Sequence, residues 1–461
     1  MKRRKKLTVL AAVLAIALIA TVCVAMIDQK TEQIKEFGAT VLNIPADSVD
    51  TLSWEYQGKT YALTRGEQWN FDDDADFPVS RTAMDELLAG FEEVGASFCI
   101  ENVEDYGQYG LDEPACTIRL GAGEENWEIR LGAFSKMDQQ RYADFGDGNV
   151  YLLVEDPMDH FDQGRDPLMQ HDEMPQVESA DRIEFAGQQN YAIVRDPENG
   201  KSFREADHYF AEFDGPPEPV DPLSIENYLK NLSDLRLTTD MTYTAGQEDL
   251  SVYGLDEPEL TVTVTYTEDS EQKSYALAIS RDPAEVAELE DDETKTPKSY
   301  ARLNNSEIVY LLSGSDYENL AACGFDDLRH REVFPADIGL ITEIGIAMDD
   351  TAYTLTTDPD ATKQQFQYEG LGVDASAVTD SLSQIRASEF TDEAGSGRVE
   401  LRLDVSLSTG DALVLEFHQK DSESSLAVLN GQTLAKVPRS QVVQLREDIN
   451  SVVLRPAEEA E

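Results

Sequence analysis

The sequence is poor in the residue types on which most catalytic and metal sites depend. It has only five histidines and four cysteines among 461 residues. The histidines contain no HExxH motif or other close ligand pair, so a zinc site is not indicated; they are His160, His171, His208, His330 and His418. GxSxG, a Walker A loop and GxGxxG after a strand are also missing. Without these motifs, the sequence does not indicate any of the common catalytic or nucleotide-binding sites that a short motif marks. It leaves open only a catalytic triad assembled from distant residues.

Cysteine is too scarce for a disulfide-dependent scaffold. Cys23 lies in a long apolar stretch, which leaves Cys99, Cys116 and Cys323 in the rest of the chain. Three is an odd number, so not all of these cysteines can pair, and the chain is large enough to build hydrophobic cores without disulfide bonds. A Cys99 to Cys116 bridge remains an alternative, but we expect these cysteines to act as small buried hydrophobic residues.

Basic residues are scarce and unevenly placed. Five of the 37 precede Leu7, and no acidic residue precedes Asp28, so the chain from Asp28 onward has 32 basic and 91 acidic residues, a net charge of −59. A body of this sign repels nucleic acid and anionic lipid head groups. Neither is expected to be a partner.

The N-terminal region contains one long uncharged apolar run, LTVLAAVLAIALIATVCVAMI, which starts at Leu7 and ends at Ile27. A helix of 21 residues spans about 30 Å, the hydrocarbon thickness of a bilayer. It is longer than the apolar part of a cleaved signal peptide. We expect a single-pass membrane anchor, with the basic tip in the cytoplasm and the body outside. A signal cleaved near Ala25 is the alternative.

The remaining chain repeats itself. YGLDEP occurs at residues 109–114 and again at 253–258. Each copy follows a hairpin pattern and a helix pattern, at 79–94 and 220–235, and precedes matching strands at 149–156 and 308–315. An acidic insert around residues 287–298 accounts for the longer second copy.

A third, divergent copy begins near Ile341. It repeats the hairpin at 341–355, the helix at 377–390 and the next strand at 399–407, while YGLDEP has decayed to DEAGSGR at 392–398. The pattern predicts an α+β protein with three tandem units, each a mainly antiparallel sheet with about one packed helix. The expected boundaries are 1–27 for the tip and anchor, 28–48 for a juxtamembrane segment, and 49–165, 177–325 and 338–456 for the units.

We interpret YGLDEP as a piece of scaffold. Gly110 and Gly254 suit a tight turn, and the proline that ends each copy suits the start of a strand. Tyr109 and Leu111 should pack into a core, and Asp112 should cap the turn through a backbone hydrogen bond. A joint acid/base or metal site is less favoured, because adjacent carboxylates in an extended segment point in opposite directions; these are Asp112 and Glu113, and Asp256 and Glu257.

Two further groups of residues invite a functional interpretation. Acidic runs at 72–76 and 288–293 could attract calcium, but neither matches an EF-hand loop, so solvated loops are favoured. Trp54, Trp69 and Trp127 could form a carbohydrate-stacking platform, although core packing is the favoured role.

The repeated Y-G-L-D-x-P motif before an alternating strand, together with the basic tip and the apolar segment, resembles the family called domain of unknown function 4340 (DUF 4340). The resemblance covers most of residues 50–323, with 341–453 as a weaker copy. The family has no established activity, so no catalytic residue is implied. Its members look like membrane-anchored exported proteins, often encoded beside ABC-2 type permeases and gliding-type ABC transporter subunits. The resemblance therefore implies that the membrane is that of a bacterial cell.

Two functions from different classes follow as expectations. The first is a non-enzymatic accessory component of a cell-envelope complex, such as an ABC transporter, with no catalytic, cofactor-binding or metal-binding residues. The second is an extracellular binder of a cell-wall glycan or polymer, in a groove between units lined by tryptophan or tyrosine.

Overall fold

A computed structural model describes residues 39–101, 103–198, 200–213, 215–288, 296–357, 364–395 and 397–454. The chain divides into two compact bodies, Met1–Asp172 and Glu173–Glu461, which we call the N-terminal and C-terminal bodies. The predicted membrane segment, residues 7–27, lies outside the described residues, and so do all of the residues 28–38. In the described part of the chain, no helix is both long and apolar enough to cross a bilayer.

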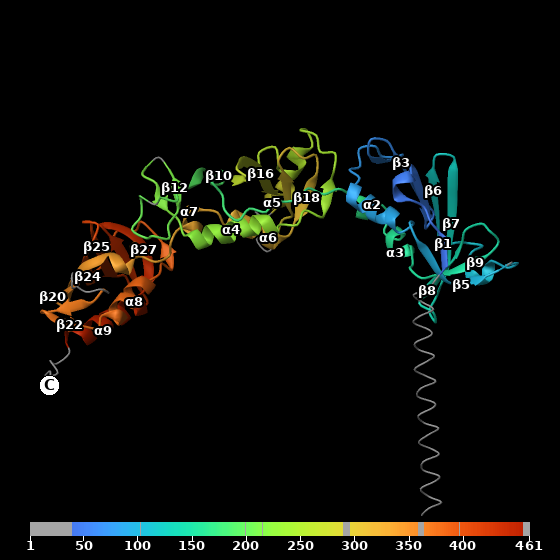
Figure 1. Ribbon diagram of the computed structural model, residues 1–461. Helices are drawn as coiled ribbons and strands as arrows, with labels where there is room; N and C mark the ends of the chain where they lie inside the picture. Colours follow the sequence, from blue (N-terminus) through green and yellow to red (C-terminus); the bar gives the residue numbers. More distant parts are fainter. Residues whose placement is uncertain are drawn as a thin grey trace, which may run out of the picture. The chain divides into compact units, whose positions relative to one another are not determined.

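The chain builds one sheet design three times, as the internal repeats predict (Figure 1). Each sheet has nine strands, and every pair of neighbouring strands is antiparallel; the orders are β1-β5-β9-β8-β7-β6-β2-β3-β4, β13-β12-β11-β10-β15-β16-β17-β18-β14 and β22-β21-β20-β19-β24-β25-β26-β27-β23. Eight of the nine strands occupy equivalent positions in all three sheets. The ninth is an edge strand: β1 lies at one edge of the first sheet, whereas β13 and β22 lie at the opposite edge of the second and third. The predicted α+β class and the three tandem sheets are therefore confirmed.

The first repeat forms the described part of the N-terminal body. Its strands are β1 Ala39–Leu42, β2 Thr51–Tyr56, β3 Lys59–Arg65, β4 Trp69–Phe71, β5 Val94–Ile100, β6 Cys116–Ala122, β7 Glu125–Ser135, β8 Gln140–Asp144 and β9 Val150–Leu153. Its helices are α2 Arg81–Ala89 and α3 Met158–Phe161, with short 3-10 turns η1 Ala46–Ser48, η2 Gly107–Tyr109 and η3 Asp166–Leu168. Because β1 pairs with β5, the first sheet already begins within the expected juxtamembrane segment 28–48.

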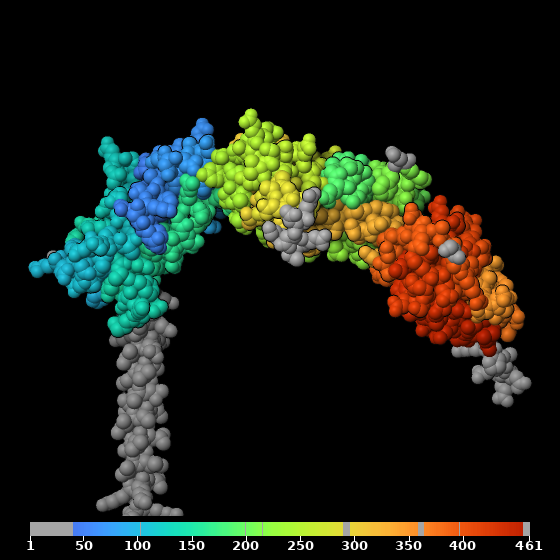
Figure 2. Space-filling view, turned by 180° about the vertical axis from the view of Figure 1, so that it is seen from behind, coloured from blue at the N-terminus to red at the C-terminus, as the bar shows by residue number. Residues whose placement is uncertain are grey.

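The second and third repeats form the C-terminal body. The second contains β10 Arg182–Gly187, β11 Tyr191–Arg195, β12 Tyr209–Glu212, β13 Glu218–Pro219, α4 Pro222–Asp234, β14 Asp240–Thr242, η4 Leu250–Tyr253, β15 Leu260–Glu268, β16 Glu271–Arg281, α5 Pro283–Glu288, β17 Ser299–Leu303, β18 Val309–Leu312, α6 Gly314–Ala321 and α7 Phe325–Leu328. The third contains η5 Ile338–Leu340, β19 Ile341–Met348, β20 Thr351–Thr357, β21 Phe366–Tyr368, β22 Leu371–Val373, α8 Ser376–Gln384, β23 Glu389–Phe390, β24 Val399–Leu407, β25 Ala412–Gln419, β26 Ser424–Leu429, β27 Gln432–Pro438 and α9 Arg439–Val453. In Figure 2 the yellow-green and orange repeats of this body meet along a continuous surface.

Two-residue turns with positive φ close the predicted opening hairpins of the first and third repeats. Gln57 and Gly58 have φ of 50° and 75°, and Asp349 and Asp350 have φ of 48° and 60°. Such paired left-handed residues match the right-handed twist of the two strands that they join. The registers are therefore fixed locally, with Tyr56 opposite Lys59 and Met348 opposite Thr351.

YGLDEP forms the turn that the sequence predicts. Gly110 and Gly254 end η2 and η4 with φ of 70° and 67°, and Leu111 and Leu255 are buried behind them. The prediction that Asp112 caps the turn is wrong. Its side chain is exposed and accepts no hydrogen bond from the described residues, because backbone bonds from the glycine and the leucine already close the turn.

The strand after each motif turns one apolar face to the core. Cys116, Ile118 and Leu120 are at most 2% exposed, as are their counterparts in the second repeat, Leu260, Val262 and Val264. Burial raises the pKa of the Cys116 thiol to about 12. Cys99 is exposed, Cys323 is buried, and all three cysteines are free thiols, so the alternative Cys99 to Cys116 bridge is not formed.

Among the described residues, the first and third repeats contain two helices each and the second contains four. The predicted helices are α2, α4 and α8, and each is joined by a second one after the last long strand: α3, α6 and α9. In Figure 1, α4 lies beside α6 and α8 beside α9. The expectation of about one packed helix per unit was too low. The missed helix α9 buries Val442, Leu445 and Ile449 at the spacing of one helical face.

Candidate binding sites

The residues that could suggest a metal or a glycan site do not gather into one. No group of three or more His, Cys, Asp or Glu among the described residues is placed to hold a metal ion. In the acidic run 72–76, Asp72 accepts a hydrogen bond from Thr64, 2.9 Å away, and Asp74 pairs with Arg165. Most of the second run, residues 289–293, lies outside the described residues.

The tryptophans are mainly core residues. Trp54 and Trp69 are 1% and 6% exposed, and the Trp54 ring stacks on Tyr61 with centroids 4.8 Å apart. Trp127 is partly exposed on β7. Two of the three indoles are therefore inaccessible to a sugar, and the carbohydrate platform built from them is not formed.

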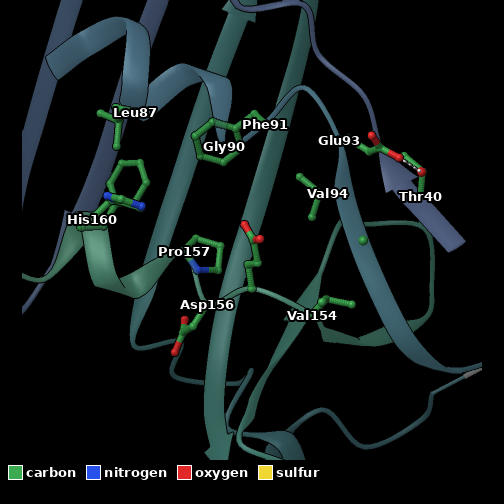
Figure 3. A pocket seen from close by; sticks show the side chains of 13 residues that line it. Thr40, Leu87, Gly90, Phe91, Glu93, Val94, Val154, Asp156, Pro157 and His160 are labelled. Atoms are coloured by element: carbon green, nitrogen blue, oxygen red, sulfur yellow. Dashed lines mark hydrogen bonds between the residues drawn. The ribbon is translucent and has the colours of Figure 1, made fainter. Parts of the chain in front are cut away.

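The first repeat contains a hollow between α2 and α3 that we call the first-repeat recess (Figure 3). Its volume is about 210 Å³. Leu87 and Phe91 from the α2 end, Phe161 from α3 and Val94 from β5 form an apolar floor, and each of them is at most 8% exposed. Val154, just after β9, lies at the edge and is 37% exposed.

Acidic side chains surround this apolar floor. Glu93 and Glu155 are exposed lining residues, and Glu93 accepts a hydrogen bond from Thr40 at 3.3 Å. Asp156 is already engaged, because the Nε of Arg141 donates to its two oxygens at 2.7 and 2.9 Å. The rim therefore offers two carboxylates without a paired cation among the described residues.

The second repeat has a hollow at the equivalent place. The alignment of residues 79–94 with 220–235, and the alignment of 149–156 with 308–315 continued to 161 and 320, pair each of its lining residues with one from the first-repeat recess. This second hollow measures only about 80 Å³, and it is lined by Asn231, Asp234, Leu235, Asp316, Asn319 and Leu320. The same position in the fold thus holds a larger hollow with an apolar floor in one repeat and a much smaller hollow in the next.

Two substitutions between the repeats account for the difference. Gly90 stands where the second repeat has Asn231, so no side chain enters the first-repeat recess from that position. Leu87 stands where the second repeat has Tyr228, whose hydroxyl donates to the Leu320 carbonyl at 2.9 Å. The tyrosine bridges the two helices of the second repeat, whereas the shorter leucine leaves the gap open.

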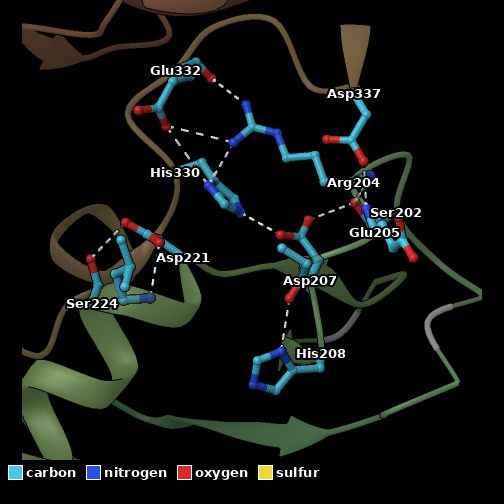
Figure 4. Close-up of polar contacts among 12 residues, drawn as sticks. Ser202, Arg204, Glu205, Asp207, His208, Asp221, Ser224, His330, Glu332 and Asp337 are labelled. Carbon is cyan, nitrogen blue, oxygen red and sulfur yellow. Dashed lines mark hydrogen bonds and ion pairs between the residues drawn. The ribbon is translucent and has the colours of Figure 1, made fainter. Parts of the chain in front are cut away.

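A second cluster of chemically capable residues lies at the junction of the second and third repeats (Figure 4). The carboxylate of Asp207 is fully buried and accepts from Ser202 Oγ at 2.6 Å. Its other oxygen lies 2.8 Å from His330 Nε2. On the far side of the ring, Arg204 Nη1 lies 2.7 Å from His330 Nδ1, and Arg204 Nη2 donates to the Phe334 carbonyl at 2.6 Å.

This Asp–His pair is arranged for structure and not for proton transfer. Arginine can only donate, so His330 Nδ1 accepts and Nε2 carries the hydrogen that reaches Asp207. Both ring nitrogens are therefore occupied, and the Ser202 hydroxyl points to the carboxylate instead of the imidazole. A general base needs a free nitrogen within reach of the nucleophile, and this imidazole offers none.

A cleft of about 560 Å³ lies beside the same junction. It is lined by Arg329, the β23 residue Phe390, the carboxylates of Glu218, Asp326 and Asp392, and residues of β26 and β27. The Arg329 guanidinium lies over the Phe390 ring and pairs with Asp326 at 2.8 Å. One face of the only aromatic ring that lines the cleft is therefore covered by the arginine.

No local sequence pattern identifies the residues of these sites. The histidines show no close partner along the chain, because Asp207 and His330 are 123 positions apart. The recess had a signal, since the alignment of the repeats already placed Gly90 opposite Asn231 and Leu87 opposite Tyr228. At both positions the first repeat has the smaller side chain, and both positions lie near the C-terminal end of the same helix, α2 in the first repeat and α4 in the second.

The family model described as Domain of unknown function (DUF4340) matches residues 69–209 and 212–404, which covers parts of all three repeats. No match to the chain was found among the curated proteins or among the solved structures.

Proposed function

The chain belongs to the DUF4340 family, and on that premise we propose that it is a membrane-tethered, extracytoplasmic accessory protein without enzymatic activity. Its body binds another component of an envelope complex, of the ABC exporter class that the resemblance implies. The observation that carries the proposal is the first-repeat recess. It combines an apolar floor with an acidic rim, and the hollow at the equivalent place in the second repeat is much smaller.

Several features support binding over catalysis. Surfaces that expose an apolar floor within a polar rim are typical of protein interaction sites. The one buried Asp–His pair of the junction has both imidazole nitrogens engaged. The strongly acidic body is suited to select a partner by charge.

The glycan-binding alternative is less well supported. It needs an open aromatic face in a groove between repeats, and the cleft beside the second and third repeats has a suitable volume. However, Arg329 covers one face of Phe390 in that cleft, and Trp54 and Trp69 are buried elsewhere.

Brief formaldehyde crosslinking of intact cells that produce the full-length chain tests the proposal. We expect purification of the chain to recover an integral membrane protein of an export complex. The matched control replaces residues 1–27 with a cleavable secretion signal, which releases the same body from the membrane. The released body should recover much less of that protein, because tethering raises its local concentration. Recovery of glycan without any membrane protein would show that the proposal is wrong.

A further inference from the structure

We infer that the first-repeat recess is a docking site for a segment of a membrane-embedded partner that carries a large apolar side chain next to lysine or arginine. This inference deepens the proposed function and rests on it. It specifies where the partner binds and what chemistry the partner presents.

The size of the recess indicates side chains as the occupant. At about 210 Å³ it is smaller than the roughly 300 to 1,000 Å³ of sites for cofactors and other small molecules. It is still too large for a well-packed interior, which leaves few voids larger than a water molecule. One or two aliphatic or aromatic side chains from a partner would fill it.

The second repeat shows that the fold does not require the hollow. There, Tyr228 and Asn231 fill most of the equivalent position, and its helices α4 and α6 still pack together. The first repeat has a smaller residue at both places and exposes Phe91, Phe161 and Val94 to the hollow. An opening confined to one copy of a repeated scaffold indicates a role that its sister copy does not share.

The charges around the recess favour a partner segment in which basic residues lie next to the large apolar side chain. Glu93 and Glu155 line the rim, and the lining residues include neither lysine nor arginine; the exposed His160 is their only basic side chain. A cation beside the apolar side chain would pair with these carboxylates, whereas an acidic flank would be repelled. The chemistry therefore fits an apolar residue followed or preceded by Lys or Arg.

The position of the recess along the chain places it near the membrane. Thr40 lines the recess, and it follows Ile27, the end of the predicted anchor, by 13 residues. Even a fully extended chain of that length reaches at most about 45 Å. The recess therefore lies within reach of segments that a membrane protein exposes just outside the bilayer, and this favours such a protein over a freely diffusing one.

The test is photo-crosslinking in intact cells with the full-length chain. A benzoylphenylalanine at Val154, on the edge of the recess, is compared with one at Met137, which is 89% exposed and does not line it. We expect Val154 to crosslink to a membrane protein. Mass spectrometry should map the bond to a segment outside the bilayer that contains a large apolar residue within about one helical turn of Lys or Arg.

Filling the recess should abolish the Val154 crosslink. Gly90→Phe places a ring in the hollow and should lower the yield at least about tenfold, the factor expected when one apolar side chain loses its burial. Gly90→Asn copies the second repeat and should give an intermediate loss. Thr82→Phe adds the same ring to the exposed side of α2 and should leave the yield unchanged.

Other outcomes separate the inference from the function that it rests on. Crosslinks from Val154 to residues 28–38, to a second copy of this chain, or to an acidic segment would overturn the inference. A membrane partner captured from Met137 and not from Val154 would overturn it too, and would leave the proposed function standing. If neither position captured a membrane protein, both the inference and the proposed function would be contradicted.

Discussion

The guanidinium carbon of Arg329 lies 3.4 Å from the centroid of the Phe390 ring, and this contact joins the second repeat to the third. The same guanidinium carbon lies 5.1 Å from the centroid of Phe325 on α7. Desolvation lowers the pKa of Arg329 from its usual value. The arginine thus contacts two rings from neighbouring repeats, each at a distance where a cation and an aromatic face attract each other.

Removing the ring should loosen this junction. Phe390→Leu keeps an apolar side chain but abolishes the cation–π contact, so the free energy of unfolding of the C-terminal body should fall by about 1 kcal/mol. Hydrogen exchange of residues 329–333 should become faster. Leu371→Ala, at a side chain that is 66% exposed in the same repeat, serves as the control and should change little. Unchanged exchange at 329–333 in Phe390→Leu would show that the contact does not hold the junction.

The buried carboxylate of Asp207 should stabilise the same junction more strongly. Asp207→Ala leaves Ser202 Oγ and His330 Nε2 without their acceptor, which should cost about 1 to 3 kcal/mol in urea unfolding. Trypsin should then cleave faster after Arg329 and Arg331. The comparison is Asp196→Ala, which removes a partly exposed pair with Lys201 and should cost at most about 1 kcal/mol. Equal effects of the two substitutions would contradict a special role for Asp207.

The glycine of the repeated motif should be more sensitive than another glycine with the same backbone conformation. Gly110 has φ of 70°, and a Cβ there would lie 2.9 Å from the Ala133 backbone nitrogen. Gly123 has φ of 60°, but a Cβ there would meet no atom within 4 Å. Gly123→Ala therefore reports the backbone strain alone, about 1 kcal/mol. Gly110→Ala should cost clearly more in thermal unfolding, and a similar cost for both would exclude the contact as the reason for glycine.

Acid should destabilise the third repeat through Glu400. Burial alone would raise the pKa of this carboxyl, but Arg439, 2.6 Å away, lowers it below its usual value. The ionised pair thus stabilises the fold above the unfolded-state pKa of about 4.3, and this contribution is lost as the pH falls through the lower folded-state pKa. Glu400→Gln should lower the Tm at pH 7 and reduce its fall between pH 5 and pH 2. Glu343→Gln, at an exposed strand position, should keep the pH dependence of the original chain.

Thiol reactivity should separate the three cysteines of the body. Burial raises the pKa of Cys116 and of Cys323 to about 12, so almost no thiolate forms at pH 7.5, and the reagent cannot reach the sulfur. Maleimide followed by peptide mass spectrometry should label Cys99 in the folded protein. Cys116 and Cys323 should react only after denaturation, and rapid labelling of either one would contradict the packing described for its repeat.

Features with local patterns were predictable from the sequence, and contacts between distant residues were not. Repeated hairpins and the alternation at Cys116, Ile118 and Leu120 require only neighbours along the chain, so their strands and buried faces followed directly. The helix α9 also had a signal in Val442, Leu445 and Ile449, three apolar residues on one helical face, which the count of one helix per repeat overlooked.

The candidate sites depend on packing that no single stretch of sequence encodes. The pairing of Asp207 with His330 requires the segment after α7 to fold back against the loop before β12, and no spacing rule connects residues so far apart. The first-repeat recess exists because Leu87 is shorter than Tyr228 and Gly90 lacks the side chain of Asn231. Such a void becomes visible only when the neighbours of both positions are known.

The edge strand β1 has a mechanical consequence. It is the first described element after the N-terminal region, and its pairing with β5 joins Ala39 to Ala96, Thr40 to Gly95 and Leu42 to Val94. A pulling force on the N-terminal end of the chain would load these few backbone hydrogen bonds before any other part of the sheet. Tension between a membrane tether and the body would therefore be felt first at Thr40 and Gly95, two residues that also line the first-repeat recess.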